Sequence, residues 1–107
     1  MKAIFIDAKN QEVSLVENKG QLEDMYLIMK VDTIQIGRYY PNGDTLYVDE
    51  EGLINGTSFG FSLDGRDFLG NGLIYGTNRE NPEYPASAVT PLDKIKVTFF
   101  KLVEEPA

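Results

Sequence analysis

The chain has 107 residues, of which 42% are apolar, and it carries a formal net charge of −7. This length predicts a single domain over residues 1–107 with enough apolar side chains for one core. The sequence contains no Cys and no His, which excludes disulfides, zinc–thiolate sites, thiol nucleophiles and the commonest general base. The acidic charge argues against binding to nucleic acid or to anionic lipid.

The N-terminal region predicts two strands rather than a leader or a membrane anchor. Residues 2–7 are apolar on both faces through the centre, residues 11–16 supply a second strand, and the short connection predicts an antiparallel hairpin. The apolar stretch at the start is shorter than a signal peptide requires, and no apolar run approaches the length of a transmembrane helix. We therefore expect a cytoplasmic protein.

Residues 19–31 form the strongest helix candidate. Asn18 is the expected N-cap, and Leu27 and Ile28 are expected to widen the buried stripe of the helix. The stripe itself follows the helical spacing i, i+3, i+4 and i+7, and consists of Leu22, Met25, Tyr26 and Met29.

A second hairpin follows the helix. Residues 33–40 and 45–49 alternate between apolar and polar positions, as strands with one buried face do. Between them lies Asn42–Gly43, the pair that favours a type I′ turn because both of its central residues need a positive φ. The pattern predicts an antiparallel hairpin closed by this turn.

Residues 50–91 are rich in glycine, and eight of the ten glycines lie between Gly43 and Gly76. Residues 72–77 are expected to form a buried strand, and residues 78–89 an irregular loop. Thr90–Pro91 predicts an N-cap followed by one helical turn over residues 91–94. Residues 95–103 then alternate as a final strand, with Ile95, Val97 and Phe99 on one face.

The acidic residues are concentrated in the middle of the chain. Residues 44–84 contain eight acidic residues against Arg66 and Arg79, a charge of −6. Clustered carboxylates could hold Ca²⁺ or Mg²⁺, but the spacing matches no EF-hand loop, and the glycines do not follow the order of a phosphate-binding loop. We therefore expect no metal and no cofactor.

The same region contains most of the aromatic residues. Tyr39–Tyr40 lies beside a turn, and Phe59–Gly60–Phe61 lies in a glycine-rich stretch. These rings could face a partner, since Tyr and Phe are favoured at interfaces, or they could fill the core.

Three segments resemble a small family found in bacteria, phages and plasmids, known as domain of unknown function 3846. The segments are residues 1–6, residues 43–52 (GDTLYVDEEG) and residues 70–77 (GNGLIYGT), in a similar order along most of the chain. The resemblance implies an accessory protein of a mobile element. It implies no activity and no functional residue.

These patterns together predict an α+β fold, with a mostly antiparallel sheet of five to seven strands and one main helix packed on one face. The leading hypothesis is an acidic protein-interaction module, an accessory or anti-defence factor of a phage or plasmid, whose open sheet edges would also allow a homodimer. The expected surface is acidic and aromatic, and consists of Asp49, Glu50, Glu51, Phe59, Phe61, Asp64, Asp67 and Tyr84. The alternative is a small-molecule-binding domain whose glycine-rich loops shape a pocket. A carboxylate-dependent enzyme is a third hypothesis, which no catalytic motif supports.

Overall fold

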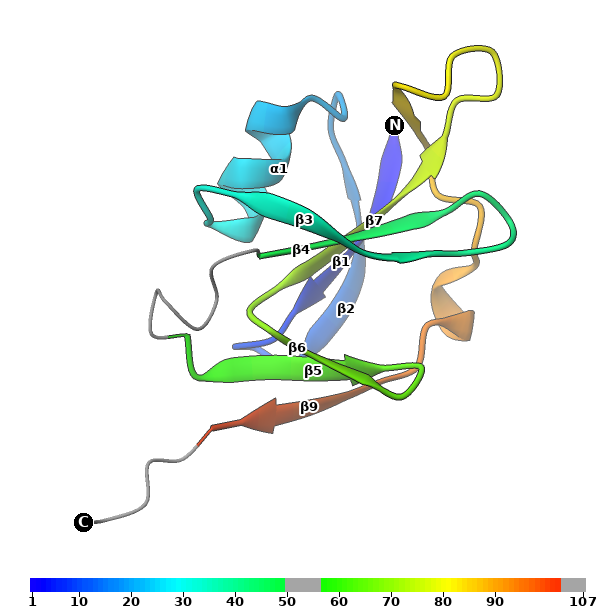
Figure 1. Cartoon of the computed structure of the whole chain (residues 1–107). Coiled ribbons are helices and arrows are strands. Elements are labelled where there is room, and N and C mark those ends of the chain that lie inside the picture. Colours follow the sequence, from blue (N-terminus) through cyan, green and yellow to red (C-terminus); the bar gives the residue numbers. More distant parts are fainter. Residues whose placement is uncertain (50–56, 103–107) are drawn as a thin grey trace, which may run out of the picture.

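The computed structural model describes residues 1–49 and 57–102 of the chain (Figure 1). Within them lie nine strands, one α-helix and one turn of 3₁₀ helix. In chain order these are β1 (Lys2–Asp7), β2 (Glu12–Glu17), α1 (Leu22–Met29), β3 (Ile34–Tyr39), β4 (Thr45–Asp49), β5 (Phe59–Leu63), β6 (Arg66–Leu69), β7 (Gly72–Thr77), β8 (Pro85–Ala86), the 3₁₀ turn (Leu92–Lys94) and β9 (Val97–Lys101).

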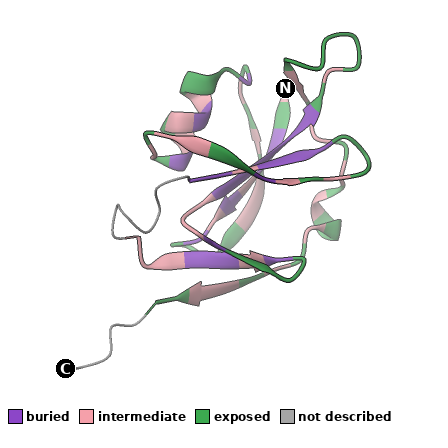
Figure 2. Ribbon diagram, viewed as in Figure 1, coloured by how far each residue is buried: buried purple, intermediate pink, exposed green. Residues whose placement is uncertain are grey.

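The larger sheet is built around β7, a strand from late in the chain. Its order is β2–β1–β7–β4–β3, and β8 pairs with the end of β7. All of these pairs are antiparallel, and their register places Ile74 between Ile4 of β1 and Leu46 of β4. With a strand on each side and a packed layer on each face, β7 is buried along nearly its whole length (Figure 2).

Alternation along these strands divides the core into two parts. In β1 and β7, Ile4 and Ile74 pack toward the second sheet, whereas Ala3, Leu73 and Tyr75 pack toward α1. Successive side chains of a strand point to opposite faces, so one run of residues can serve both cores. The result is three layers: α1, the six-stranded sheet and a three-stranded sheet (Figure 1).

The smaller sheet has the order β6–β5–β9 and carries the aromatic part of the core. Phe61 of β5 is fully buried, and its ring centroid lies 5.3 Å from that of Phe68 in β6. The ring also lies against Gly72 of β7, where a Cβ atom would come within 2.7 Å of it. The two sheets can approach this closely because position 72 has no side chain.

The predicted fold class is confirmed, since the strand pairs are antiparallel and one helix covers one face of the main sheet. The main sheet has six strands, within the five to seven expected, and β5, β6 and β9 form a second sheet that the sequence did not predict. The buried strand over residues 72–77 is confirmed, and the final strand, β9, lies within the predicted range.

The helix is shorter than predicted, and the expected cap is wrong. The N-cap is Gln21 rather than Asn18, and its backbone N–H donates to the Asp24 carboxylate at 3.2 Å. Gly20 has φ +71°, which a right-handed helix does not allow, so the helix cannot start before it. Asn18 instead accepts hydrogen bonds from the Gly20 N–H at 2.8 Å and from the Tyr75 hydroxyl at 2.6 Å.

The buried stripe of the helix is also narrower than predicted. Met25 and Met29 are buried and Ile28 is partly buried against the same cluster. Leu27 is 78% exposed, so the prediction that it widens the stripe is wrong, and Leu22 is 52% exposed.

The second hairpin is confirmed, but its turn differs from the one predicted. Gly43 has φ +94°, whereas Asn42 is not among the described residues with positive φ. The Gly43 N–H donates to the Tyr40 carbonyl at 3.0 Å, so Pro41 and Asn42 are the central residues of a turn that Gly43 then closes. Proline fixes φ near −65° and favours this three-residue loop over a type I′ turn.

The turn with two positive φ angles lies between β5 and β6. Asp64 has φ +52° and Gly65 has φ +81°, and Leu63 pairs with Arg66 across them. Asp–Gly is a usual sequence for a type I′ hairpin.

One helical turn follows residue 91 as predicted, although Thr90 does not cap it. The N-cap is Pro91, which makes no side-chain hydrogen bond there. The Thr90 N–H and hydroxyl both donate to the carboxylate of Asp44, at 2.9 Å and 2.5 Å.

Candidate functional site

The predicted acidic and aromatic residues do not form one surface. Phe61 has no exposed area, because it occupies the inward position in the middle of β5. Asp49 is buried at the end of β4. Neither side chain is available to a partner of the folded chain. Glu50 and Glu51 lie outside the described residues.

The remaining predicted residues lie at different places on the molecule. Asp64 and Asp67 are exposed in the β5–β6 hairpin, and Phe59 is half-buried with the Lys101 ammonium 5.3 Å from its ring centroid. Tyr84 is exposed in the loop between β7 and β8, at the opposite end of the view in Figure 1 from β5 and β6. These four exposed or half-buried residues therefore remain candidates for contact with a partner, but not as one continuous surface.

A hollow of about 520 Å³ lies on the α1 side of the large sheet. It is bounded by the start of α1, the sheet and the loop before β8, and its surface is mostly apolar. We call it the helix-face groove; it is lined by Met1, Lys19, Gly20, Gln21, Leu22, Met25, Ile34, Tyr47, Glu83, Tyr84 and Pro85.

The groove exists because α1 is too short to cover its face of the sheet. The helix has 8 residues, which corresponds to a length of about 12 Å and a width of about 10 Å. Five strands at a spacing of about 4.8 Å span about 19 Å between the outer axes. The helix packs chiefly on β7, which leaves β4 and β3 only partly covered.

Apolar side chains on the uncovered part of this face are exposed. Ile36 pairs with Tyr47 across β3 and β4, and Tyr39 pairs with Thr45, so all four side chains lie on the helix side. Ile36 is 44% and Tyr39 is 70% exposed. Burial, followed by the nearby Tyr39, raises the pKa of Tyr47. The exposed face therefore continues from the groove along the β3–β4 hairpin.

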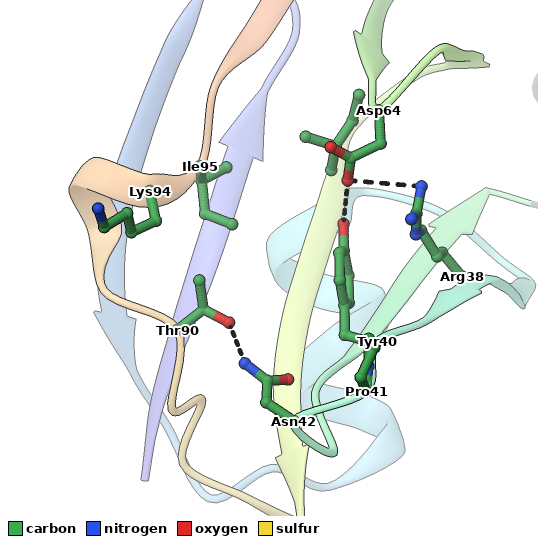
Figure 3. A pocket seen from close by; sticks show the side chains of 9 residues that line it. Arg38, Tyr40, Pro41, Asn42, Asp64, Thr90, Lys94 and Ile95 are labelled. Carbon is green, nitrogen blue, oxygen red and sulfur yellow. Dashed lines mark hydrogen bonds and ion pairs between the residues drawn. The ribbon is translucent and has the colours of Figure 1, made fainter.

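A second hollow, of about 390 Å³, lies where three separate segments meet. We call it the hairpin pocket; it is lined by Arg38, Tyr40, Pro41, Asn42, Leu63, Asp64, Thr90, Lys94 and Ile95. Figure 3 shows Arg38, Tyr40 and Asp64 gathered on one wall, with Thr90 and Ile95 facing them from the other. The Asn42 side-chain amide joins the walls by donating to the Thr90 hydroxyl at 2.7 Å.

The wall formed by Arg38, Tyr40 and Asp64 is held by loose polar contacts. An Arg38 guanidinium nitrogen lies 3.5 Å from Asp64, and the Tyr40 hydroxyl donates to the same carboxylate oxygen at 3.4 Å. The guanidinium carbon also lies 5.2 Å from the centroid of the Tyr40 ring. Burial, and after it the Asp64 charge, raises the pKa of Tyr40 to about 12.

This raised pKa predicts a loss of stability at alkaline pH. The unfolded phenol ionises near pH 10, whereas the folded one stays neutral to about pH 12. The contribution of Tyr40 to the free energy of unfolding is therefore fully present below pH 10 and is lost between pH 10 and pH 12. Because Tyr40 is partly exposed, we expect the loss to be about 1 kcal/mol rather than the full linkage value. Urea unfolding at pH 8 and pH 11 should show a smaller loss for Tyr40→Phe than for the parent chain; equal losses would contradict the assignment.

Sequence reasoning missed both hollows. The groove combines residues from the N-terminus, α1, β3, β4 and the loop before β8, and the pocket combines three turns. The Tyr39–Tyr40 pair beside a turn was one available signal for the exposed face that continues from the groove, where Tyr39 lies. For the hairpin pocket, no motif or spacing in the sequence indicates that Arg38 and Lys94 lie near each other. Among the residues that the structure describes, no group of three or more His, Cys, Asp or Glu side chains could hold a metal ion.

A family model described as domain of unknown function (DUF3846) matches residues 1–93. The chain belongs to this family. The DUF3846 match covers every residue that lines the helix-face groove, whereas Lys94 and Ile95 of the hairpin pocket lie just beyond it. Comparison with curated proteins and with solved structures found no match. No helix within residues 1–49 and 57–102 has the length and apolar character needed to cross a membrane.

Proposed function

We propose that this DUF3846 domain is a protein-interaction module that binds an amphipathic, basic helix of a partner protein in the helix-face groove. The observation that carries the proposal is a sheet face with an apolar hollow of about 520 Å³ beside a helix that leaves the rest of the face uncovered. In the role of an accessory or anti-defence factor of a phage or plasmid, the domain would find this partner in the host cell.

The dimensions of the uncovered face favour a helix as the occupant. The helix α1 packs on the central strand β7, and the axis of β3 lies two strand spacings, about 10 Å, from that of β7. Packed helices have axes about 8–10 Å apart, so a second helix has room beside α1. The place over β7 is taken by α1, whose Met25 and Met29 are buried. A sheet buries its apolar face against another element, and a partner's helix beside α1 would complete the layer over β4 and β3.

The chemistry of the groove defines the face that the partner helix presents. Leu22, Tyr47 and Tyr84 offer aliphatic and aromatic contacts, and aromatic residues at the centre of an interface supply much of its binding energy. Glu83 and Lys19 both line the groove, and Glu23 and Asp24 lie in the first turn of the helix that bounds it. With a chain charge of −7, this excess of acidic residues favours an apolar stripe flanked by Lys and Arg.

The test compares two glutamate substitutions in the same helix. Leu22 lines the groove and is 52% exposed, whereas Leu27 does not line it and is 78% exposed. We expect Leu22→Glu to reduce the yield of partner captured from host lysate at least about tenfold, a loss typical of a residue central to an interface. Leu27→Glu adds the same charge and should capture as the parent chain does. Circular dichroism checks that both variants fold.

A photo-crosslinking amino acid at position 84 locates the contact. The proposal expects the crosslinked partner peptide to be helical, with apolar residues at i, i+3, i+4 and i+7 and basic flanks. Equal capture by the parent chain and Leu22→Glu would overturn the groove as the binding surface, and an extended or acidic crosslinked segment would overturn the helix.

A further inference from the structure

We propose that the hairpin pocket is a second, independent site, which binds the oxyanion group (phosphate or carboxylate) of a small molecule with a compact apolar body. The pocket is separate from the helix-face groove, and the two share no lining residue. Its volume of about 390 Å³ lies within the range of small-ligand sites.

The walls of the pocket present more hydrogen-bond donors than acceptors. The nearest carboxylate oxygen to the Arg38 guanidinium is 3.5 Å away at Asp64, longer than a charge-assisted hydrogen bond. The Lys94 ammonium makes no hydrogen bond or ion pair with the part of the chain that the structure describes. Arg and Lys together carry eight N–H donors and no acceptor, so the missing component is a group rich in acceptors.

The other polar groups of the pocket are already paired. The Thr90 hydroxyl donates to Asp44 and accepts from Asn42. The Asp44 carboxylate behind them is fully buried and accepts from Val89 and Thr90. Asp44 therefore presents no free carboxylate to the pocket, and Asp64 is the one acidic residue in its lining. An incoming oxyanion competes with Asp64 for Arg38.

The other residues that line the pocket are apolar, so they favour a ligand with an apolar body. Leu63 is buried beneath the pocket, and Ile95 and Pro41 line its sides. Figure 3 shows the Lys94 side chain turned away from Arg38. Lys94 is exposed, so its flexible stem can turn the ammonium over a bound oxyanion at little cost. Arg38 then anchors the oxyanion from one wall, and Lys94 closes over it from the other.

The test is a titration of the ¹⁵N-labelled full chain at constant ionic strength, followed by two-dimensional NMR. Three probes separate the sources of the oxyanion: inorganic phosphate, phenyl phosphate and benzoate. We expect saturable shifts confined to residues 38–42, 63–66 and 90–95. One of the two organic probes should bind more tightly than inorganic phosphate. Absence of shifts with all three probes would overturn the proposal that the pocket binds an oxyanion. Tightest binding of inorganic phosphate would overturn the proposal that the ligand has an apolar body.

Four variants test the roles of the charges. Arg38→Gln and Lys94→Gln should each weaken binding about tenfold. Lys96→Gln, the matched control two residues away and outside the pocket, should leave it unchanged. Asp64→Asn keeps a residue that tolerates positive φ in the β5–β6 turn and removes the competing carboxylate, so it should tighten binding. Equal weakening by Lys96→Gln and Lys94→Gln, or weaker binding by Asp64→Asn, would contradict the proposal even if Arg38→Gln fails to fold.

Discussion

Replacing Asp44 by Ala should destabilise the domain by about 3–4 kcal/mol, although Asp44 lies in a turn, where most aspartates are exposed. The Asp44 carboxylate has no exposed area and accepts three hydrogen bonds: from Val89 N–H at 3.0 Å, Thr90 N–H at 2.9 Å and the Thr90 hydroxyl at 2.5 Å. Hydrogen bonds to a charged group contribute about 1.5–3 kcal/mol each, and a buried N–H left without an acceptor costs about 1–3 kcal/mol. The substitution therefore removes the hydrogen bonds that hold the β3–β4 turn against the segment that follows β8.

Urea unfolding followed by circular dichroism measures this effect. Asp44→Asn keeps one acceptor oxygen and should lose about half as much stability. Asp93→Ala removes an exposed carboxylate from the 3₁₀ turn and should stay within about 0.5 kcal/mol of the parent chain. A loss below about 1 kcal/mol for Asp44→Ala would mean that the three hydrogen bonds contribute little.

Phe61→Ala should destabilise the domain by about 3–5 kcal/mol, the range for removing a large buried aromatic side chain. The ring is fully buried between the sheets, beside Phe68 and against Gly72. Truncation leaves a cavity that the paired strands on both sides cannot close. Phe59→Ala, two residues earlier in the same strand and half-buried, should cost clearly less.

A double substitution tests the contact with Gly72 directly. Gly72→Ala places a Cβ atom within 2.7 Å of the Phe61 ring, so it should destabilise the parent chain. The smaller Leu at position 61 relieves this contact, so Gly72→Ala should cost less in a Phe61→Leu background. If the two losses simply add, Phe61 and Gly72 are not in the contact that the structure describes.

The secondary structure near the N-terminus was predictable because its signals are local. The β1–β2 hairpin, α1 and the β3–β4 hairpin each follow from the apolar pattern of adjacent residues. Where two local signals competed, the prediction was less accurate. Asn42–Gly43 favoured a type I′ turn, but Pro41 and the Gly43–Tyr40 hydrogen bond give a different loop. The Asp64–Gly65 pair carries the same signal and forms the turn with two positive φ angles.

The surface could not be predicted, because burial depends on which strands become neighbours. In the sequence, Asp44 and Asp49 are part of an acidic segment, but both are buried in the fold, Asp44 against Val89 and Thr90. Phe61 and Tyr84 are similar aromatic residues in similar glycine- and proline-rich surroundings, yet one is in the core and the other is 59% exposed. The helix-face groove and the hairpin pocket are formed by segments far apart in the chain, so no spacing indicates either of them.

The central position of β7 has a consequence for how the domain is made. The β1–β2 and β3–β4 hairpins are local, but each reaches the rest of the sheet only through β7. During synthesis the two hairpins emerge first, each with an open edge, and they stay separate until residue 77 has emerged. Folding then requires a late strand to insert between two early ones, a topology dominated by distant contacts and therefore slow. In that interval the open edges of β1 and β4 are exposed to strands of other nascent chains, so chaperone dependence should be greatest before β7 is complete.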